Sequence, residues 1–171
     1  MASESLFVLL TGRLDNCRIA GTSVRESGLV VSTETFPGET ILFFHIDSLE
    51  GRQCLSLLGE GAKACDYLVF YAKSDDGKEV ACFLELKGKK LEDAIKQVLS
   101  THQRVIVLAK EEIDREQQKY IFWKVCICMH GQAPRPGQHS VDQLIKTFGR
   151  DNVLVKHGVK HYKQLGAFLR G

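Results

Sequence analysis

An aspartate, a glutamate and a lysine stand at the ends of two neighbouring apolar runs. Asp66 opens the run at residues 67–71, and Glu85 and Lys87 close the run at residues 80–86. Two carboxylates a few ångströms apart in a partly desolvated site repel by roughly 4 kcal/mol at an effective dielectric near 20, which a divalent cation can offset. Mg²⁺ suits this task because it binds oxygen ligands from one or two carboxylates, waters and a substrate phosphate. The three residues therefore predict metal-assisted phosphodiester hydrolysis, with Lys87 orienting the attacking water or stabilising the transition state.

Whether the three side chains meet depends on the hairpin that joins the two runs, for which residues 74–77 carry the turn signal. If the chain turns about the bond after Asp75, Asp66 faces Glu85. If Asp76 and Gly77 are instead the two loop residues, Asp66 faces Lys87. Both registers place the three side chains on one face, because strand side chains alternate and opposed residues share a face. A shift by a single residue would separate them.

The flanking sequence predicts an α/β fold. Leu91, Ala94, Ile95 and Val98 recur at helical spacing, which predicts a helix over residues 91–100. Apolar and β-branched runs predict the remaining strands at residues 40–46, 105–109, 120–129 and 152–156. A capping box that begins at Ser140 predicts a helix ending at Gly149, and another helix is expected over residues 161–169. Residues 131–137 are expected to form a loop. Residues 6–10 read as a strand, and residues 24–31 as a short helix or strand.

Composition limits the chain to a broad class. With 171 residues, 44% of them hydrophobic and 26% charged, we expect a single domain over residues 1–171, an α/β sandwich with a mixed central sheet flanked by helices. No apolar run approaches the roughly 20 residues of a membrane span, and the N-terminus lacks a basic n-region, so we expect a soluble cytoplasmic protein without membrane contact. The six cysteines are expected to be reduced core thiols. Cys126, Cys128 and His130 form at most half of a zinc site.

Positive charge is concentrated in the C-terminal quarter. Residues 131–171 contain seven Lys and Arg against two Asp and Glu, a net charge of +5, whereas residues 1–130 contain sixteen against nineteen, a net charge of −3. Such a surface attracts phosphates electrostatically, although an ordinary solvated basic face explains the count equally well.

At Asp66, Glu85 and Lys87 the chain resembles the PD-(D/E)XK nuclease superfamily, whose fold is the restriction-endonuclease-like α/β sandwich. The resemblance covers about residues 40–109, in the family order of three strands, a helix and a strand. It implies a nuclease that uses Mg²⁺ or Mn²⁺, with Asp66 and Glu85 as metal ligands and Lys87 as the catalytic lysine. The carbonyl between the acid and the lysine also binds metal in that family, which here implies Leu86.

The likeness extends to smaller features. The segments Cys-Asp-Tyr-Leu and Glu-Leu-Lys-Gly, followed by a helix with Ala94, Gln97 and Thr101, resemble small uncharacterised prokaryotic and phage proteins of this superfamily. Cys65 stands where the family usually has proline. Gln97 matches a glutamine that is functional in some relatives, and its alternative interpretation is a solvated helix residue.

Two further acids are candidates for the same site. Glu26 would be an accessory acid if residues 24–31 formed the N-terminal helix from which many family members add a glutamate. Asp47, close to His45, is an alternative acid, although Asp47 and Ser48 more readily start a turn.

The sequence therefore predicts a metal-dependent nuclease that acts on DNA. Its phosphate contacts are expected from basic residues after the motif and in the C-terminal quarter, namely Lys89, Lys90, Arg104, Arg135 and Lys160. A homodimer would supply the two sites that duplex cleavage needs. The alternative is a catalytically inactive module of the same fold that binds nucleic acid or a partner protein, in which Asp66 and Glu85 only pair with lysines.

Overall fold

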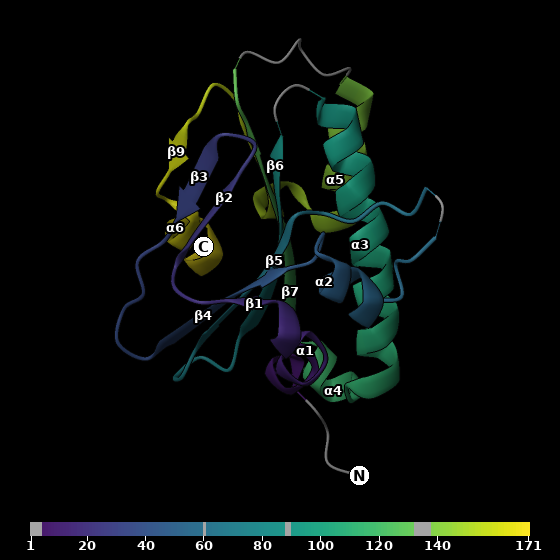
Figure 1. Ribbon diagram of the computed structural model, residues 1–171. Coiled ribbons are helices and arrows are strands. Elements are labelled where there is room, and N and C mark those ends of the chain that lie inside the picture. Colours follow the sequence, from purple (N-terminus) through teal and green to yellow (C-terminus); the bar gives the residue numbers. More distant parts are fainter. Residues whose placement is uncertain (1–4, 60, 88–89, 132–137) are drawn as a thin grey trace.

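The computed structural model of the chain describes residues 5–59, 61–87, 90–131 and 138–171 (Figure 1). Its centre is a mixed six-stranded sheet. In spatial order the strands are β1 (Arg18–Ile19), β4 (Glu39–His45), β5 (Tyr67–Lys73), β6 (Glu79–Lys87), β7 (Ile121–Met129) and β8 (Val153–Lys156). The first four strands pair antiparallel, and β6, β7 and β8 pair parallel. A parallel pair needs a crossover, which α3 (Leu91–Glu112) provides between β6 and β7.

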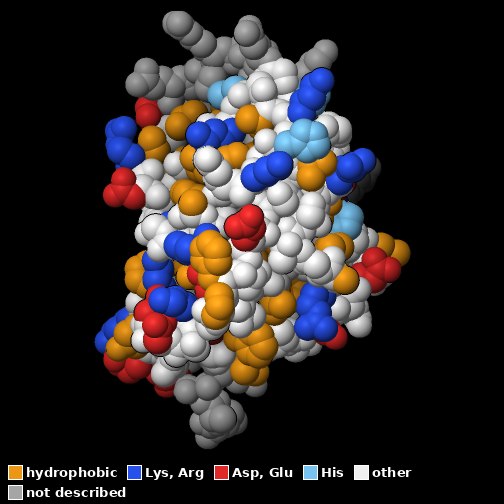
Figure 2. Space-filling view, turned by 90° about the vertical axis from the view of Figure 1, so that its left-hand side faces the viewer, with side chains coloured by type: hydrophobic (Ala, Val, Ile, Leu, Met, Phe, Trp, Pro, Cys, Tyr) orange, Lys and Arg blue, Asp and Glu red, His pale blue; other side chains and the backbone are white. Residues whose placement is uncertain are grey.

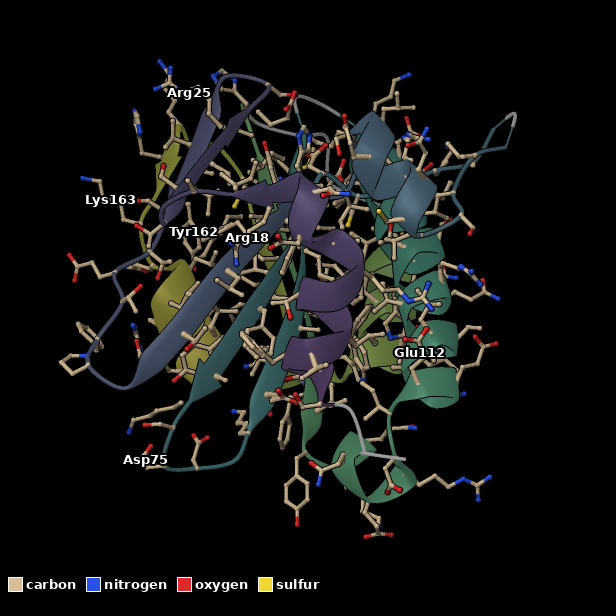
Figure 3. All side chains as sticks on the ribbon, turned by 60° about the horizontal axis from the view of Figure 1, so that its bottom comes forward. Arg18, Arg25, Asp75, Glu112, Tyr162 and Lys163 are labelled. Atoms are coloured by element: carbon tan, nitrogen blue, oxygen red, sulfur yellow. The ribbon has the colours of Figure 1, made fainter. Side chains whose placement is uncertain are left out.

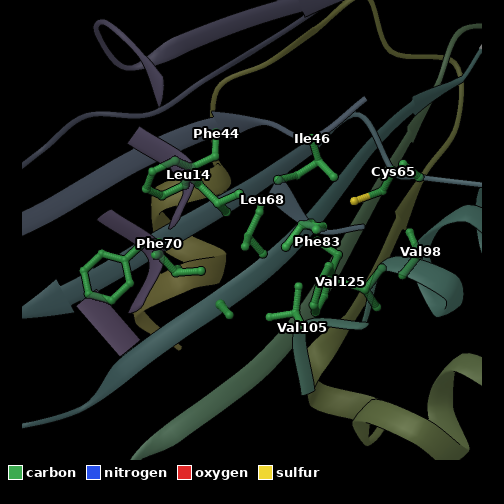
Figure 4. Packing of buried hydrophobic residues seen from close by; sticks show 14 of the residues in the cluster. Leu14, Phe44, Ile46, Cys65, Leu68, Phe70, Phe83, Val98, Val105 and Val125 are labelled. Atoms are coloured by element: carbon green, nitrogen blue, oxygen red, sulfur yellow. The ribbon is translucent and has the colours of Figure 1, made fainter. Parts of the chain in front are cut away.

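Helices cover one face of this sheet (Figure 1). This layer contains α1 (Leu6–Leu14), α2 (Leu49–Cys54), α3 and α5 (Gln138–Phe148), with the short α4 (Arg115–Gln118) after α3 and 3₁₀ turns at Asp15–Cys17 and Arg150–Asn152. Alternate strand residues such as Phe70, Phe83 and Val125 face these helices and form a buried cluster with Val98 and Val105 of α3 (Figure 4). The alternation along each strand thus decides which side chains reach the helix layer.

A second, smaller sheet covers the opposite face. It contains β2 (Ser23–Glu26), β3 (Leu29–Ser32) and β9 (His161–Tyr162), and α6 (Leu165–Arg170) packs beside it (Figure 1). The other set of strand residues, including Val69 and Leu84, packs against Val31 and Leu165 of this layer. The α/β layering with a mixed sheet flanked by helices is confirmed, and the small sheet is an addition that the sequence analysis did not foresee.

The strands at residues 40–46, 67–71, 80–86, 120–129 and 152–156 are confirmed with small changes at their ends. The strand expected at residues 105–109 is wrong, because these residues continue α3. Val105, Leu108 and Ala109 extend its buried stripe at helical spacing, whereas Val107 is exposed.

The N-terminal expectations need similar corrections. Residues 6–10 are helical, because the Ser5 side chain accepts the Val8 N–H and the Glu79 carboxylate accepts the N–H groups of Leu6 and Phe7. For residues 24–31 the strand alternative is confirmed: they form the β2–β3 hairpin, with Gly28 at a φ of +75° in its turn.

Two C-terminal expectations are also revised. The helix before Gly149 ends at Phe148 as expected, but it already includes Ser140, so Ser140 is not its N-cap. Residues 161–169 divide into β9 and α6. Of the loop predicted at residues 131–137, all but Gly131 lie outside the described residues.

All six cysteines are free, as expected, and five of them are buried. No helix in the described part of the chain is both long enough and apolar enough to cross a membrane.

Candidate active site

The hairpin register brings Asp66 and Glu85 together at one end of the central sheet. Tyr67 lies opposite Leu84, which is the register in which Asp66 faces Glu85. The Asp66 N–H donates to Glu85 Oε2 over 2.9 Å, and the Leu86 N–H donates to Asp66 Oδ2 over 2.7 Å. Each carboxylate therefore accepts a backbone N–H from the opposite strand, which fixes both side chains across the pair.

Asp66, Glu85 and Lys87 all lie on the helix-covered face. On β6, Phe83 belongs to the cluster under the helices, whereas Leu84 belongs to the cluster under the small sheet. Because side chains alternate, Glu85 and Lys87 share the face of Phe83. The side chains meet where β6 ends and α3 is about to begin, so α3 borders the site.

Two side chains of α3 hold the segment that leads into Asp66. Gln97 Nε2 donates to the Ala64 carbonyl over 2.8 Å, and the Thr101 hydroxyl accepts the Cys65 N–H over 2.8 Å. Gln97 and Thr101 stand one helical turn apart, so they contact successive residues of the extended segment. Gln97 is thus a partly buried positioning residue rather than a solvated one.

Burial dominates the electrostatics of the two acids. Glu85 is fully buried and Asp66 is 5% exposed. Desolvation raises the pKa of Glu85 to about 8, and the neighbouring Asp66 charge adds to the rise while Lys87 opposes it. Desolvation also raises the pKa of Asp66 to about 6, against the hydrogen bond from Leu86 and the charge of Lys87. Both carboxyl groups therefore hold their protons more tightly than in water.

Lys87 supplies the positive charge that faces these acids. Its Nζ lies 2.9 Å from Glu85 Oε1, and its side chain is 27% exposed. Burial acts to lower the pKa of Lys87, but the contact with Glu85 and the charges of Glu85 and Asp66 outweigh it, so the net shift is upward. One ammonium thus stands against two carboxylates in this cluster.

The oxygen set of this site suits a hard divalent cation. Glu85 Oε1 is buried and accepts no hydrogen bond of good geometry from the described residues, although the Lys87 ammonium lies 2.9 Å away. No group of three or more His, Cys, Asp or Glu side chains gathers around a point in the described part of the chain. Mg²⁺ needs no such group, because it retains several waters and takes substrate oxygens as ligands. The residues that fit it are Asp66 and Glu85, and the Leu86 peptide lies against Asp66.

The two accessory acids occupy other positions. Glu26 lies on β2, so the helix on which its accessory role depended is not formed. Its charge nevertheless contributes to raising the pKa of Asp66, and so does that of Asp47. Asp47 accepts from Arg52 Nε over 2.7 Å, and Ser48 is the N-cap of α2, as the turn interpretation requires.

The basic residues predicted to bind phosphate do not form one group. Lys90 is exposed at the start of α3, near the site, whereas Arg104 lies further along α3 and donates to the Leu55 carbonyl over 2.8 Å. Lys160 lies beside the small sheet, on the opposite face of the central sheet. Lys89 and Arg135 lie outside the described residues.

A pocket of about 400 Å³ adjoins Lys87, and we call it the basic pocket. Its polar lining consists of Arg52, Lys63, Lys87, Lys90, Asp93 and Gln97. Sequence analysis missed Arg52 and Lys63, because nothing in their spacing relates α2 and the following segment to the motif. Only the packing of α2 beside α3 brings them to the site.

A second basic group lies on the small sheet. Arg25, His157, Lys160, His161 and Lys163 are exposed there, and we call this group the small-sheet surface. Lys, Arg and His side chains gather over the upper half of that face (Figure 2), and Arg25 and Lys163 point outwards from the layer (Figure 3). In the described part of the chain, no ion pair involves Arg25, Lys160 or Lys163.

The cysteines of the zinc alternative face the core rather than a metal site. Cys126 and Cys128 are fully buried on β7 with their Sγ atoms 3.9 Å apart, and His130 is exposed beyond the end of the strand. Two thiols and an outlying imidazole do not reach the four protein ligands that structural zinc takes.

No family model, no curated protein and no solved structure matches this chain.

Proposed function

We propose that this chain is a divalent-metal-dependent phosphodiester hydrolase that acts on DNA. The observation that carries the proposal is the cluster at the end of the sheet, where Asp66 faces Glu85 across the hairpin and Lys87 Nζ lies 2.9 Å from Glu85. Two buried carboxylates beside one ammonium leave a negative charge that a divalent cation can neutralise. Mg²⁺ or Mn²⁺ is the proposed cofactor.

The order of elements supports placing the chain with the PD-(D/E)XK nucleases. Antiparallel strands β4, β5 and β6 are followed by α3 and the parallel strand β7. This is the order that the resemblance implies, with β7 in place of the strand expected at residues 105–109. Asp66 and Glu85 stand at the facing ends of β5 and β6, the second and third strands in this order, which supports the proposal.

Each residue has a distinct task in the proposed reaction. Asp66 and Glu85 hold the cation, and the backbone N–H groups of Leu86 and Asp66 fix their remaining oxygens. When bound, the cation lowers the pKa of a coordinated water and polarises the phosphoryl oxygen. Lys87 orients the attacking water and stabilises the charge that develops on the phosphate. Gln97 and Thr101 keep Asp66 in place through the backbone of the preceding segment.

Cleavage assays test the proposal directly. Supercoiled plasmid and single-stranded DNA are incubated with Mg²⁺, Mn²⁺ or a chelator, using wild type, Glu85→Ala and Lys87→Ala. Matched controls are Glu111→Ala and Lys110→Ala, which remove the same residue types from exposed positions at the other end of α3. We expect metal-dependent products from wild type and both controls, and none from the two site variants. Equal products from all five proteins would refute the assignment.

The inactive module has one observation in its favour. Lys87 already contacts Glu85, and both acids accept backbone N–H groups, so the cluster has internal partners without any metal. In that case the chain would bind DNA through its basic surfaces without cutting it. Binding of labelled DNA with no cleavage under any metal condition would favour this second function. A homodimer, which we propose for duplex cleavage, would be detected by light scattering.

A further inference from the structure

The basic pocket has a composition that the hydrolytic chemistry does not require. Four cations line it, from α2 (Arg52), the segment after it (Lys63), the end of β6 (Lys87) and the N-cap of α3 (Lys90). Among the residues that the structure describes, Asp93 is the only acid in its lining. Arg52, Lys63 and Lys87 pair with Asp47, Asp93 and Glu85, and Lys90 makes no ion pair in the described part of the chain. The pocket of about 400 Å³ therefore keeps an excess of positive charge, which favours an anion.

Arg52 is held so that its guanidinium is only partly used. Its Nε and one N–H of Nη2 donate to Asp47, and Nη1 donates to the Ala62 carbonyl. A guanidinium has five N–H donors, so two remain for another acceptor. The bonds to Asp47 and Ala62 fix the plane of the group, which favours recognition of a phosphate over loose charge attraction.

The start of α3 adds to the positive potential of the pocket. Lys90 is the N-cap of this 22-residue helix and makes no side-chain capping bond. A lysine here is unfavourable on its own, because the first turn already carries the positive end of the helix dipole and its free N–H groups. Glu92 and Asp93 offset part of this charge, but a bound anion would relieve the remainder.

Position relates the pocket to the cluster of acids. Lys87 belongs to both, since its Nζ contacts Glu85 while its side chain lines the pocket. A phosphate in the pocket is therefore a neighbour of the phosphate that the acids and their cation would hold. Lys63 is free enough to take part, because its contact with Asp93 is 3.6 Å long and both side chains are more than a third exposed.

We propose that the basic pocket binds a second phosphate of the substrate strand, adjacent to the phosphate that is cleaved. The proposal rests on the proposed function for its substrate. It adds a positioning site at α2 and the start of α3, to which the substrate strand binds. Arg52, Lys63 and Lys90 hold this second phosphate. Lys87 then contacts the substrate strand at a fixed distance along it from that phosphate. Contacts to the backbone alone carry no base preference.

Binding measurements without metal separate this proposal from catalysis. Fluorescence anisotropy with a labelled single-stranded oligonucleotide compares Lys63→Glu/Lys90→Glu with Lys110→Glu/Lys146→Glu. The second pair lies on exposed helix positions of α3 and α5 outside the pocket lining, and both double variants lower the net charge by the same amount. Losing the charge-assisted hydrogen bonds to one phosphate corresponds to about 10- to 100-fold weaker binding of the oligonucleotide. We expect that loss for the pocket variant, with a salt slope smaller by about 0.7, and wild-type affinity within about threefold for the control.

A second measurement tests the pocket directly. Inorganic phosphate is titrated into labelled protein while the backbone amide NMR signals of Lys63 and of Glu92 and Asp93 are followed. We expect these signals to move in wild type and to stay in place in the milder variant Lys63→Gln/Lys90→Gln, whose fold is checked by its other signals. The oligonucleotide should move the same signals. A response to inorganic phosphate alone would overturn the proposal, since the pocket would then serve a small phosphorylated ligand.

The outcomes distinguish the two proposals. If wild type cuts DNA and the pocket variant binds and cuts with unchanged KM, the pocket proposal is overturned while the nuclease stands. Equal weakening in both charge-matched double variants also overturns it, because general electrostatics would explain the loss. If wild type never cuts but the pocket variant alone loses oligonucleotide binding, the phosphate site is supported and the nuclease proposal fails.

Discussion

The electrostatics of the site can be measured at Glu85, because its ionisation changes the free energy of unfolding with pH. Desolvation, with the Asp66 charge, raises its pKa from 4.5 to about 8. Since each pKa unit corresponds to about 1.4 kcal/mol, keeping this carboxylate ionised costs the folded protein up to about 5 kcal/mol above pH 8. Replacing it with glutamine removes that cost, because the amide has no charge to desolvate and its oxygen can still accept the Asp66 N–H.

The pH dependence has a definite sign. Between about pH 4.5 and pH 8, Glu85 is ionised in the unfolded chain and protonated in the folded protein, so folding takes up a proton. The free energy of unfolding of wild type therefore falls as the pH rises through this window. Asp66, with its pKa raised to about 6, acts in the same direction between about pH 4 and pH 6. The raised pKa of Lys87 adds stability throughout the window, which is lost only at much higher pH.

Urea unfolding of wild type and Glu85→Gln measures the difference. We expect equal stability near pH 5 and a variant more stable by about 2–3 kcal/mol near pH 9, since the pKa of about 8 already includes the contact with Lys87 and water entering beside Lys87 removes about half of the full figure. Excess Mg²⁺ should stabilise wild type near pH 9 and leave the variant unchanged, because only the ionised pair binds it. Glu111→Gln, at an exposed position, is the matched control and should follow wild type.

A flat profile would refute this reasoning. If wild type were equally stable near pH 5 and pH 9 and Glu85→Gln were less stable at both, the contact with Lys87 would outweigh desolvation. The cluster would then be a satisfied ion pair, with no deficit for a cation to fill.

Two further substitutions test how the elements position the site, each against a matched control. Thr101→Val leaves the buried Cys65 N–H without its acceptor and should cost about 1–3 kcal/mol in urea unfolding, whereas Thr147→Val removes an exposed hydroxyl and should be near neutral. Gly51→Ala would bring a Cβ to 2.5 Å from the His45 carbonyl oxygen, so α2 must shift, and we expect a loss of about 1–3 kcal/mol. Gly12→Ala in α1, where nothing lies within 4 Å, should instead stabilise by about 0.5–1 kcal/mol. Similar costs within either pair would contradict the packing argument.

Local sequence signals predicted the strands that carry the motif but not everything around them. The hairpin runs of β5 and β6 are almost continuously apolar, and turn residues separate them. The period of two along a strand therefore placed Asp66, Glu85 and Lys87 on one face in either admissible register. The choice between the registers depended on the turn itself. The sequence left that open, and the pairing of Tyr67 with Leu84 resolves it.

The failures have a common physical cause, which is that short apolar runs fit more than one structure. Residues 105–109 are apolar enough for a buried strand, but Val105 and Leu108 continue the stripe that begins at Leu91. Residues 6–10 are helical partly because Glu79, more than seventy positions away, caps the first turn. Contacts of this range leave no trace in a local pattern.

Charge counting along the sequence also failed to locate a surface. The net charge of +5 in residues 131–171 is real, but the tertiary structure divides it between the layers, with Lys146 on α5 in the helix layer and Lys160 and Lys163 beside the small sheet. Two cations of the basic pocket, Arg52 and Lys63, come from the part of the chain whose net charge is negative. Linear charge density therefore does not locate the basic pocket.

The charge balance of the cluster bears on which of the two proposed functions fits better. A purely structural ion pair balances one acid with one base, and a buried excess of charge is destabilising. Here Asp66 and Glu85 share the single ammonium of Lys87, while Glu26 and Asp47 add negative potential at Asp66. In a module without metal, a proton would relieve this excess, and burial together with the neighbouring acid charges raises the pKa of both acids in that direction. A divalent cation would relieve it at neutral pH without protonation, and this is the reason we propose a metal site rather than a structural pair.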